Sequence, residues 1–179
     1  VTALWGRKGD VRWTHALDRR VTVRPVLADL DGDDLLDVVV QGDGRGAPVL
    51  VALRGSDHGV LWRRSDVGND PLSPPALGTF DRDGIPDVLS DSLHQGLGAF
   101  SGADGSALWF VKGELIQGRL GPARVDLSGD GLTDPVLVYA GPGDREVRWS
   151  GNSGVAELHL KAEARSGADG TALYPLHRK

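Results

Sequence analysis

A run of acidic residues that leads directly into a β-branched, apolar segment occurs three times in this chain, and it limits the possible folds more than any other feature. Each run places oxygen-bearing side chains at positions 1, 3, 5 and 9 of a loop. These residues are Asp29, Asp31, Asp33 and Asp37 in loop 1; Thr79, Asp81, Asp83 and Asp87 in loop 2; and Asp126, Ser128, Asp130 and Asp134 in loop 3. Carboxylates packed so closely repel one another unless a cation lies between them. Hard oxygen ligands in a flexible loop favour Ca²⁺ over Zn²⁺ or Cu²⁺.

The residues that follow each loop exclude an EF-hand. The beginning of the loops resembles one, but an EF-hand needs an acid at position 12 and then a helix. Position 12 is Val40, Ser90 and Leu137 in the three loops, and the segments around it favour strands. We therefore expect the acid at position 9 to complete the metal site. We also expect a further oxygen from the backbone carbonyls at position 7, which belong to Leu35, Ile85 and Leu132.

The pattern D-x-D-x-D-G-x-x-D followed by a strand is similar to the calcium loop of FG-GAP repeats, which occur in integrin α-subunit propellers and in VCBS repeat proteins. Thr79 and Ser128 depart from it with neutral oxygens, and Asp34 replaces glycine at position 6, where we expect a positive φ. The resemblance begins near residue 21 and continues to the end of the chain. It implies an all-β propeller that holds up to three structural Ca²⁺ ions. An ordinary Asp-rich turn would explain one such loop, but three loops about 50 residues apart favour metal binding.

A second repeat of eleven residues alternates with the loops. Its copies are Ala3–Trp13, Ala52–Trp62, Ala99–Trp109 and Ala164–Tyr174. Each contains a short apolar run, a Gly/Asp-rich turn and a second run that ends in an aromatic residue, which predicts a β-hairpin. One loop hairpin and one aromatic hairpin give four strands in about 50 residues, the size of a propeller blade. We expect the four aromatic residues to pack between neighbouring blades, and we expect no helices.

This alternation predicts how the chain is divided. Residues 1–20 would be the outer hairpin of a preceding blade, and residues 21–66, 67–115 and 116–179 would be blades that contain loops 1, 2 and 3. The last blade is longer and has a predicted inserted hairpin at Val147–Val155. The total is about three and a half blades, whereas a closed propeller has roughly four to eight. We expect a segment of a longer propeller; the alternative is self-association through the incomplete blade.

Residue patterns typical of enzymes and of nucleic-acid-binding proteins are not found. The histidines, which are His15, His58, His94, His159 and His177, have no metal-ligand spacing, and no nucleophile elbow or phosphate-binding loop follows a strand. The Trp-ending hairpins are similar to the Asp-box turn of sialidase-type propellers and to the tryptophan-docking motif of quinoproteins, which are structural in those families. Basic residues stand in scattered short groups, and there is no cysteine and no transmembrane run. We predict no catalytic residues, no nucleic-acid partner and no membrane insertion within this segment.

The resemblance implies a protein- or glycan-recognition and adhesion module of a larger protein, with an unidentified ligand. Millimolar calcium outside the cytosol would fill loops of modest affinity, so we expect an extracellular, cell-surface or periplasmic location. Two alternatives remain: the non-catalytic propeller part of a polysaccharide lyase, hydrolase or quinoprotein, and a purely structural array of repeats. Loop 1 has four acids among its ligand positions and is expected to bind calcium most tightly. Loop 2, with Thr79 at position 1, is expected to lose it first.

Overall fold

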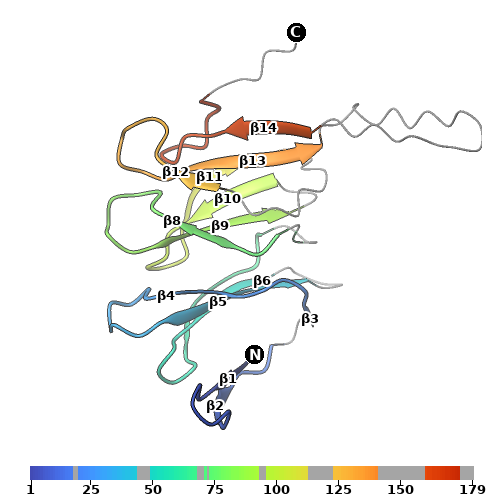
Figure 1. The fold of residues 1–179 in the computed structure, drawn as a ribbon, viewed down its shortest axis with the longest axis vertical. Helices are drawn as coiled ribbons and strands as arrows, with labels where there is room; N and C mark the ends of the chain where they lie inside the picture. Colours follow the sequence, from blue (N-terminus) through green and yellow to red (C-terminus); the bar gives the residue numbers. More distant parts are fainter. Residues whose placement is uncertain are drawn as a thin grey trace, which may run out of the picture.

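The computed structural model describes residues 1–17, 20–43, 49–67, 71, 73–92, 96–112, 123–140 and 160–173. Within these ranges the chain is all-β: every strand pairing is antiparallel and no helix is present. This confirms the predicted fold class at that level. The sheets follow one another along the long axis of the molecule from the N-terminus to the C-terminus (Figure 1). None of the described segments forms a helix with the length and apolar character that crossing a membrane requires.

The N-terminal hairpin contains β1 (Thr2–Leu4) and β2 (Val11–Thr14). The first sheet then contains β3 (Arg20–Val21), β4 (Val26–Ala28), β5 (Asp37–Asp43), β6 (Val49–Leu53) and β7 (Val60–Arg64). In this sheet β3 and β4 both pair with β5, which pairs with β6, which pairs with β7. Loop 1 connects β4 to β5, and the turn of the second aromatic repeat connects β6 to β7.

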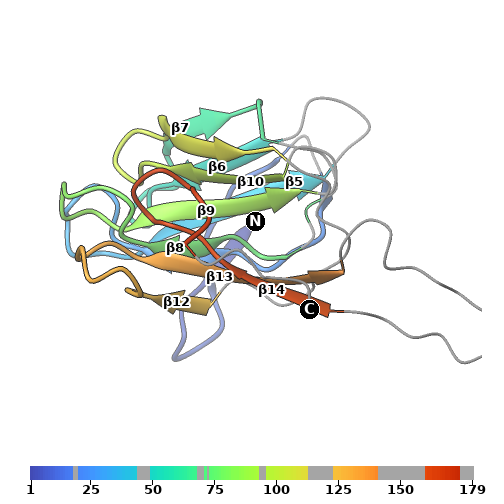
Figure 2. The same ribbon diagram turned by 90° about the horizontal axis from the view of Figure 1, so that it is seen from above.

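The second sheet has the order β8 (Ala76–Gly78), β9 (Asp87–Ser92), β10 (Gly96–Phe100) and β11 (Ala107–Val111). The third contains β12 (Ala123–Val125), β13 (Asp134–Ala140) and β14 (Leu160–Ala164), after which Arg165 bridges to Ala172. Loops 2 and 3 connect β8 to β9 and β12 to β13, so each sheet places its acidic loop between corresponding strands. All three loops lie on the same side of the molecule (Figures 1 and 2). Tyr174 and the predicted insertion lie outside the described residues.

The core consists of apolar layers between successive sheets. Strands β6 and β10 are buried along their whole length, because neighbouring sheets cover both of their faces. Trp13 packs with Val38, Val51 and Leu53, joining the N-terminal hairpin to the first sheet. A second apolar cluster lies between the first and second sheets, and its largest members are Trp62, Phe100, Leu30 and Leu50. A third cluster lies between the second and third sheets, and its largest members are Trp109, Phe80, Leu89 and Leu137.

The turns of the aromatic repeats share one backbone geometry. In the described copies, the residue at the tip donates its N–H to the carbonyl four residues earlier, over 2.7 to 2.9 Å, and has a φ between 59° and 74°. Glycine supplies this conformation at Gly9, Gly105 and Gly170, as expected for the left-handed region. His58 stands there in the turn between β6 and β7, with a φ of 59°.

Candidate metal centre

Loop 1 is organised by the carboxylate of its first acid. Asp29 Oδ1 accepts the backbone N–H groups of Gly32 and Asp33, at 2.8 and 3.2 Å, and Asp29 Oδ2 accepts that of Asp34 at 2.9 Å. The short side chain of aspartate can bond in this way to nearby backbone groups, so an Asp-rich sequence favours a tight loop. Asp34 has a φ of 63°, which confirms the positive φ expected at position 6.

The same local geometry recurs in the other two loops. The carboxylate at position 5 accepts the N–H of position 7 in all three, over 2.8 Å to Leu35, 2.7 Å to Ile85 and 2.9 Å to Leu132. Position 6 has a positive φ in loops 2 and 3 as well, 87° at Gly84 and 85° at Gly131. These two features therefore recur with the spacing of the sequence, although position 4 has a positive φ only in loops 1 and 3, at Gly32 and Gly129, and not at Arg82 of loop 2. The predicted role of the position 7 carbonyls as ligands stays a prediction.

Two of the loops bring three carboxylates within reach of one cation. In loop 1 these belong to Asp29, Asp31 and Asp37, and in loop 2 to Asp81, Asp83 and Asp87; in each group one oxygen per residue lies within 4.8 Å of the others. Asp33, also predicted as a ligand, is outside the first group. Across the described part of the chain no third cluster of this kind forms, so loop 3 (Asp126, Ser128, Asp130 and Asp134) does not gather three acids in the same way.

The aspartate at position 9 is fully buried in every loop, with none of its surface exposed at Asp37, Asp87 or Asp134. Its Oδ2 accepts the N–H of position 2, over 2.8 Å from Leu30, 2.6 Å from Phe80 and 2.8 Å from Leu127. Its Oδ1 accepts the N–H of a glycine in the aromatic turn of the same sheet, over 2.8, 3.0 and 2.8 Å from Gly55, Gly102 and Gly167. This carboxylate therefore joins the acidic loop to the aromatic turn.

Close approach of the backbone explains why these three positions are glycine. A Cβ added at Gly55 would overlap the carbonyl oxygen of Leu36, at position 8 of loop 1. The same overlap occurs between Gly102 and Pro86 in the second sheet, and between Gly167 and Thr133 in the third. The sequence contained a signal for this close approach, because glycine is the fourth residue of every aromatic repeat. Its link to the position 9 aspartate was missed, since the two are 15 to 33 residues apart.

The tryptophans connect neighbouring sheets through the same glycines. The indole Nε1–H of Trp13 donates to the carbonyl of Gly55 at 3.0 Å, that of Trp62 to Gly102 at 2.6 Å and that of Trp109 to Gly167 at 2.6 Å. Each indole is buried in the interface with the following sheet. The predicted packing role of the aromatic residues is thus confirmed for the three tryptophans, while Tyr174 lies outside the described residues.

Burial raises the pKa of Asp37 and Asp87. At Asp37 the hydrogen bonds from Gly55 and Leu30 oppose this effect, and the nearby charges of Asp31 and Asp33 add to it. Burial acts in the same direction at Asp134, but the backbone groups that donate to it outweigh burial and lower its pKa. In loops 1 and 2 the buried carboxylate is therefore held charged at a cost, which a bound cation would offset.

Positive side chains and hydroxyl groups lie beside the acids. Arg54 Nε donates to Asp31 Oδ2 at 2.8 Å on the surface, which raises the pKa of the guanidinium. Loops 2 and 3 contact each other directly, because Arg82 donates to the Asp130 carbonyl at 2.8 Å and the Thr79 and Thr133 hydroxyls are 3.1 Å apart. The hydroxyl of Thr79, a predicted ligand, therefore already has a partner.

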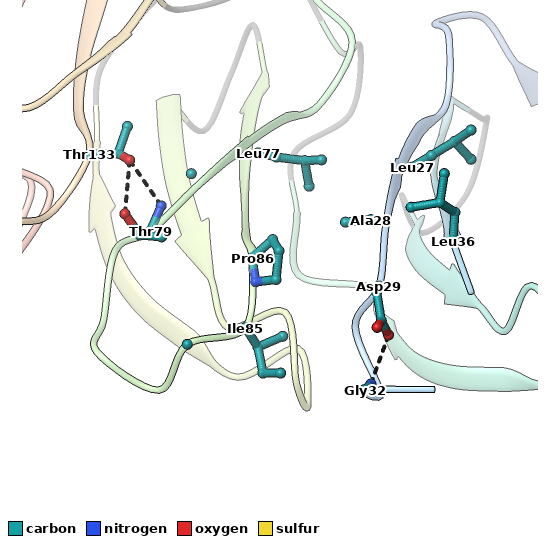
Figure 3. Close-up of a pocket in the computed structure, with 12 residues that line it drawn as sticks. Leu27, Ala28, Asp29, Gly32, Leu36, Leu77, Thr79, Ile85, Pro86 and Thr133 are labelled. Carbon is teal, nitrogen blue, oxygen red and sulfur yellow. Dashed lines mark hydrogen bonds between the residues drawn. The ribbon is translucent and has the colours of Figure 1, made fainter. Parts of the chain in front are cut away.

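A groove of about 800 Å³ lies between loops 1 and 2. Its walls contain Leu27 and Leu36 on the side of the first sheet and Leu77 and Pro86 on the side of the second (Figure 3). Leu27 and Leu36 are 51% and 59% exposed, and Asp29 of the first carboxylate cluster also lines the groove. The loop 1 cluster therefore borders a concave, partly apolar surface.

Two histidines that are distant in sequence meet at the N-terminal hairpin. The ring centroids of His15 and His58 are 5.9 Å apart, and His58 lies 5.8 Å from Trp13. Spacing alone did not predict this contact. His94, His159 and His177 lie outside the described residues.

No protein-family model matches this chain, and no curated protein has a significantly similar sequence. The fold and the loops therefore define the class on their own: within the ranges that the structure describes, the protein consists of antiparallel β-sheets and has two aspartate clusters that could hold a cation.

Proposed function

We propose that this chain is a calcium-binding module whose sheets are blades of a β-propeller of the FG-GAP/VCBS type. The observation that supports this best is the recurrence of an acidic loop between corresponding strands of three successive sheets, in which the position 5 carboxylate always accepts the position 7 N–H. A single Asp-rich turn needs no ligand, but three that share the bond between positions 5 and 7 and a buried position 9 acid favour a common ligand.

The donor set favours Ca²⁺. It consists of carboxylates with nearby hydroxyl and carbonyl oxygens, in loops exposed to solvent, whereas Zn²⁺ prefers nitrogen and sulfur ligands and Mg²⁺ demands a stricter octahedron. Asp29, Asp31 and Asp37 would hold the ion in loop 1, with Asp81, Asp83 and Asp87 in loop 2. A third ion in loop 3 would rely on Ser128 and on carbonyl oxygens as well as its acids.

The bound ion would act structurally. It would neutralise the mutual repulsion of the aspartates and fix the connection between the first two strands of each sheet. A site at a calcium concentration 100 times its dissociation constant adds about 2.7 kcal/mol to stability. Filled sites in several sheets would therefore contribute a large share of the stability of a domain this size.

Loop 1 remains the expected tightest site because it has the most acids. Arg54 offsets part of this charge through its ion pair with Asp31. Replacing Arg54 with glutamine therefore strengthens binding at loop 1, because the cation no longer competes with the guanidinium. Loop 2 lacks an acid at position 1, and its Thr79 hydroxyl contacts Thr133, so we expect it to lose calcium before loop 1.

The biological role would be recognition of a protein or glycan by an extracellular, cell-surface or periplasmic protein. The groove between loops 1 and 2 supports a binding role, because concave surfaces with apolar walls and a few polar groups are typical of ligand sites. An adhesion module of a larger protein fits this reading; the same segment would also serve as the non-catalytic part of a larger enzyme.

Calorimetric titration with CaCl₂ tests the proposal, with thermal unfolding in calcium and in EGTA. We expect saturable binding and a higher melting temperature in calcium. Asp31→Asn and Asp83→Asn should each weaken one site, whereas Asp10→Asn, an exposed acid outside the loops, should leave binding unchanged. Absence of binding heat together with identical melting in both buffers would refute the calcium proposal.

A further inference from the structure

The buried aspartate of each acidic loop has a partner that is in turn held by the neighbouring sheet. In the first junction the Trp13 indole donates to the Gly55 carbonyl, and the Gly55 N–H donates to Asp37 Oδ1. Corresponding bonds run from Trp62 through Gly102 to Asp87, and from Trp109 through Gly167 to Asp134. Three sheets of different sequence thus preserve the same two-step connection.

We propose that each tryptophan is a positioning residue for the metal loop of the following sheet, an inference that rests on the proposed calcium function. Trp13 would serve loop 1 and Trp62 would serve loop 2, the two loops that have carboxylate clusters. Trp109 would serve loop 3 in the same way. The tryptophans contact no ligand themselves and act through the intervening glycine.

The connection leaves little room for adjustment. Gly102 is bonded on its amide side by Asp87 and on its carbonyl side by Trp62, and its Cα lies against the Pro86 carbonyl so closely that a side chain does not fit. The orientation of the Asp87 carboxylate is therefore set by the position of this glycine, which depends on the docked indole. Asp87 is also one of the three acids of the loop 2 cluster, so one carboxylate belongs to both structures.

A link of this kind acts in both directions, because coupling between two equilibria is reciprocal. A cation that draws the position 9 carboxylate toward the loop changes its bond to the glycine, and hence the bond between the glycine and the indole. Removal of the indole N–H should weaken cation binding by the same route. Each tryptophan is thus expected to report on one loop.

The indole N–H signals in a two-dimensional ¹⁵N–¹H NMR spectrum of the whole chain provide the test. Trp5 is the matched control, because it is 54% exposed and takes no part in the connection. Tryptophan-to-phenylalanine variants assign the signals. We expect the Trp13 and Trp62 signals to shift as CaCl₂ is added, in step with the binding heat, while the Trp5 signal stays in place.

Calcium affinity provides the reciprocal test. Trp13→Phe and Trp62→Phe keep an aromatic ring but cannot donate the hydrogen bond, and each should weaken one site about fivefold, the effect of losing one neutral hydrogen bond. Trp5→Phe should bind as the wild type does. Two variants at separate junctions keep the test decisive if one of them folds poorly.

The two proposals fail in different ways. If calcium binds to the wild type but the indole signals do not move and both variants bind normally, the positioning role is wrong and the calcium proposal stands. If calcium does not bind to the wild type at any concentration tested, both are wrong.

Discussion

Replacement of Asp87 by asparagine should destabilise the protein even without calcium. The Asp87 carboxylate is fully buried, with Oδ2 accepting from Phe80 and Asp81 at 2.6 and 3.1 Å and Oδ1 accepting from Gly102 at 3.0 Å. Asparagine has one acceptor oxygen and one amide group. If its oxygen faces Phe80, its amide faces the N–H of Gly102, which places one donor against another.

The size of the destabilisation follows from the hydrogen bonds that asparagine cannot accept. A buried N–H left without an acceptor costs about 1–3 kcal/mol, and the remaining bonds become neutral and weaken. Removing the buried charge offsets part of this loss of stability, because desolvation disfavours the ionised form of Asp87 and raises its pKa. We expect a net loss of about 2 kcal/mol, which lowers the melting temperature of a chain this long by roughly 4–8 °C.

The assay is thermal unfolding in EGTA, with Asp83→Asn as the control. Asp83 belongs to the same loop 2 cluster, but it is exposed, and its carboxylate accepts a local hydrogen bond from the N–H of Ile85 at 2.7 Å. In EGTA this variant should melt close to the wild type, whereas in calcium both variants should lose stabilisation at loop 2. The comparison separates the structural role of position 9 from its role as a ligand.

Equal melting of the two variants in EGTA would refute the reasoning. It would mean that Asp87 matters only as a ligand, and that its bond to Gly102 contributes nothing measurable. A large loss for Asp83→Asn alone would place the structural role at position 5.

Three further outcomes are expected. Gly102→Ala should lower the free energy of unfolding by more than about 2 kcal/mol, because the new Cβ overlaps the Pro86 carbonyl. Gly6→Ala, at the same position of the first repeat, should change it little because no atom lies near that position. Urea unfolding measures both changes. Asp34→Gly should be more stable than Asp34→Ala by about 1 kcal/mol in EGTA, because the φ of 63° strains alanine. Burial holds the Asp87 pKa above its unfolded value, so the stability that its protonation contributes is fully present below the unfolded pKa and is lost as the pH rises through the raised pKa. In EGTA the melting temperature of the wild type relative to Asp87→Asn should therefore increase as the pH falls from neutral toward the ordinary aspartate pKa.

The sequence predicted those features that depend on local spacing. Acids at alternate positions followed by β-branched residues are sufficient to indicate a loop before a strand, and the positive φ at Asp34 follows from its place in that loop. The hairpins of the aromatic repeats were also predictable, because Gly/Asp turns between apolar runs rarely form anything else. The predicted ligand sets stay predictions: the three-carboxylate cluster of loop 1 does not include Asp33, and the acids of loop 3 form no such cluster.

The connections between repeats were not predictable from spacing. The bond from Gly55 to Asp37 spans 18 residues and the bond from Trp13 to Gly55 spans 42, and both depend on how strands pair and how sheets pack. Strand alternation and turn motifs describe neighbouring residues only, so they carry no information about contacts between residues this far apart in the sequence. The one available signal was glycine at a fixed place in every aromatic repeat, and its cause is steric, at the backbone of a loop that is remote in the sequence.

The arrangement places each metal-site candidate within one sheet, next to the contact that this sheet makes with the preceding one. A sheet of four short strands buries too little surface to be stable alone, so repeats of this kind depend on packing against their neighbours. Here the apolar layer between two sheets is centred on a tryptophan, and the same tryptophan reaches the glycine that holds the buried aspartate of the next loop. The charge of the acidic loop and the packing between the two sheets are therefore linked through the carboxylate of the position 9 aspartate. Removal of a cation from such a loop should loosen the contact between sheets before it disrupts the strands within either.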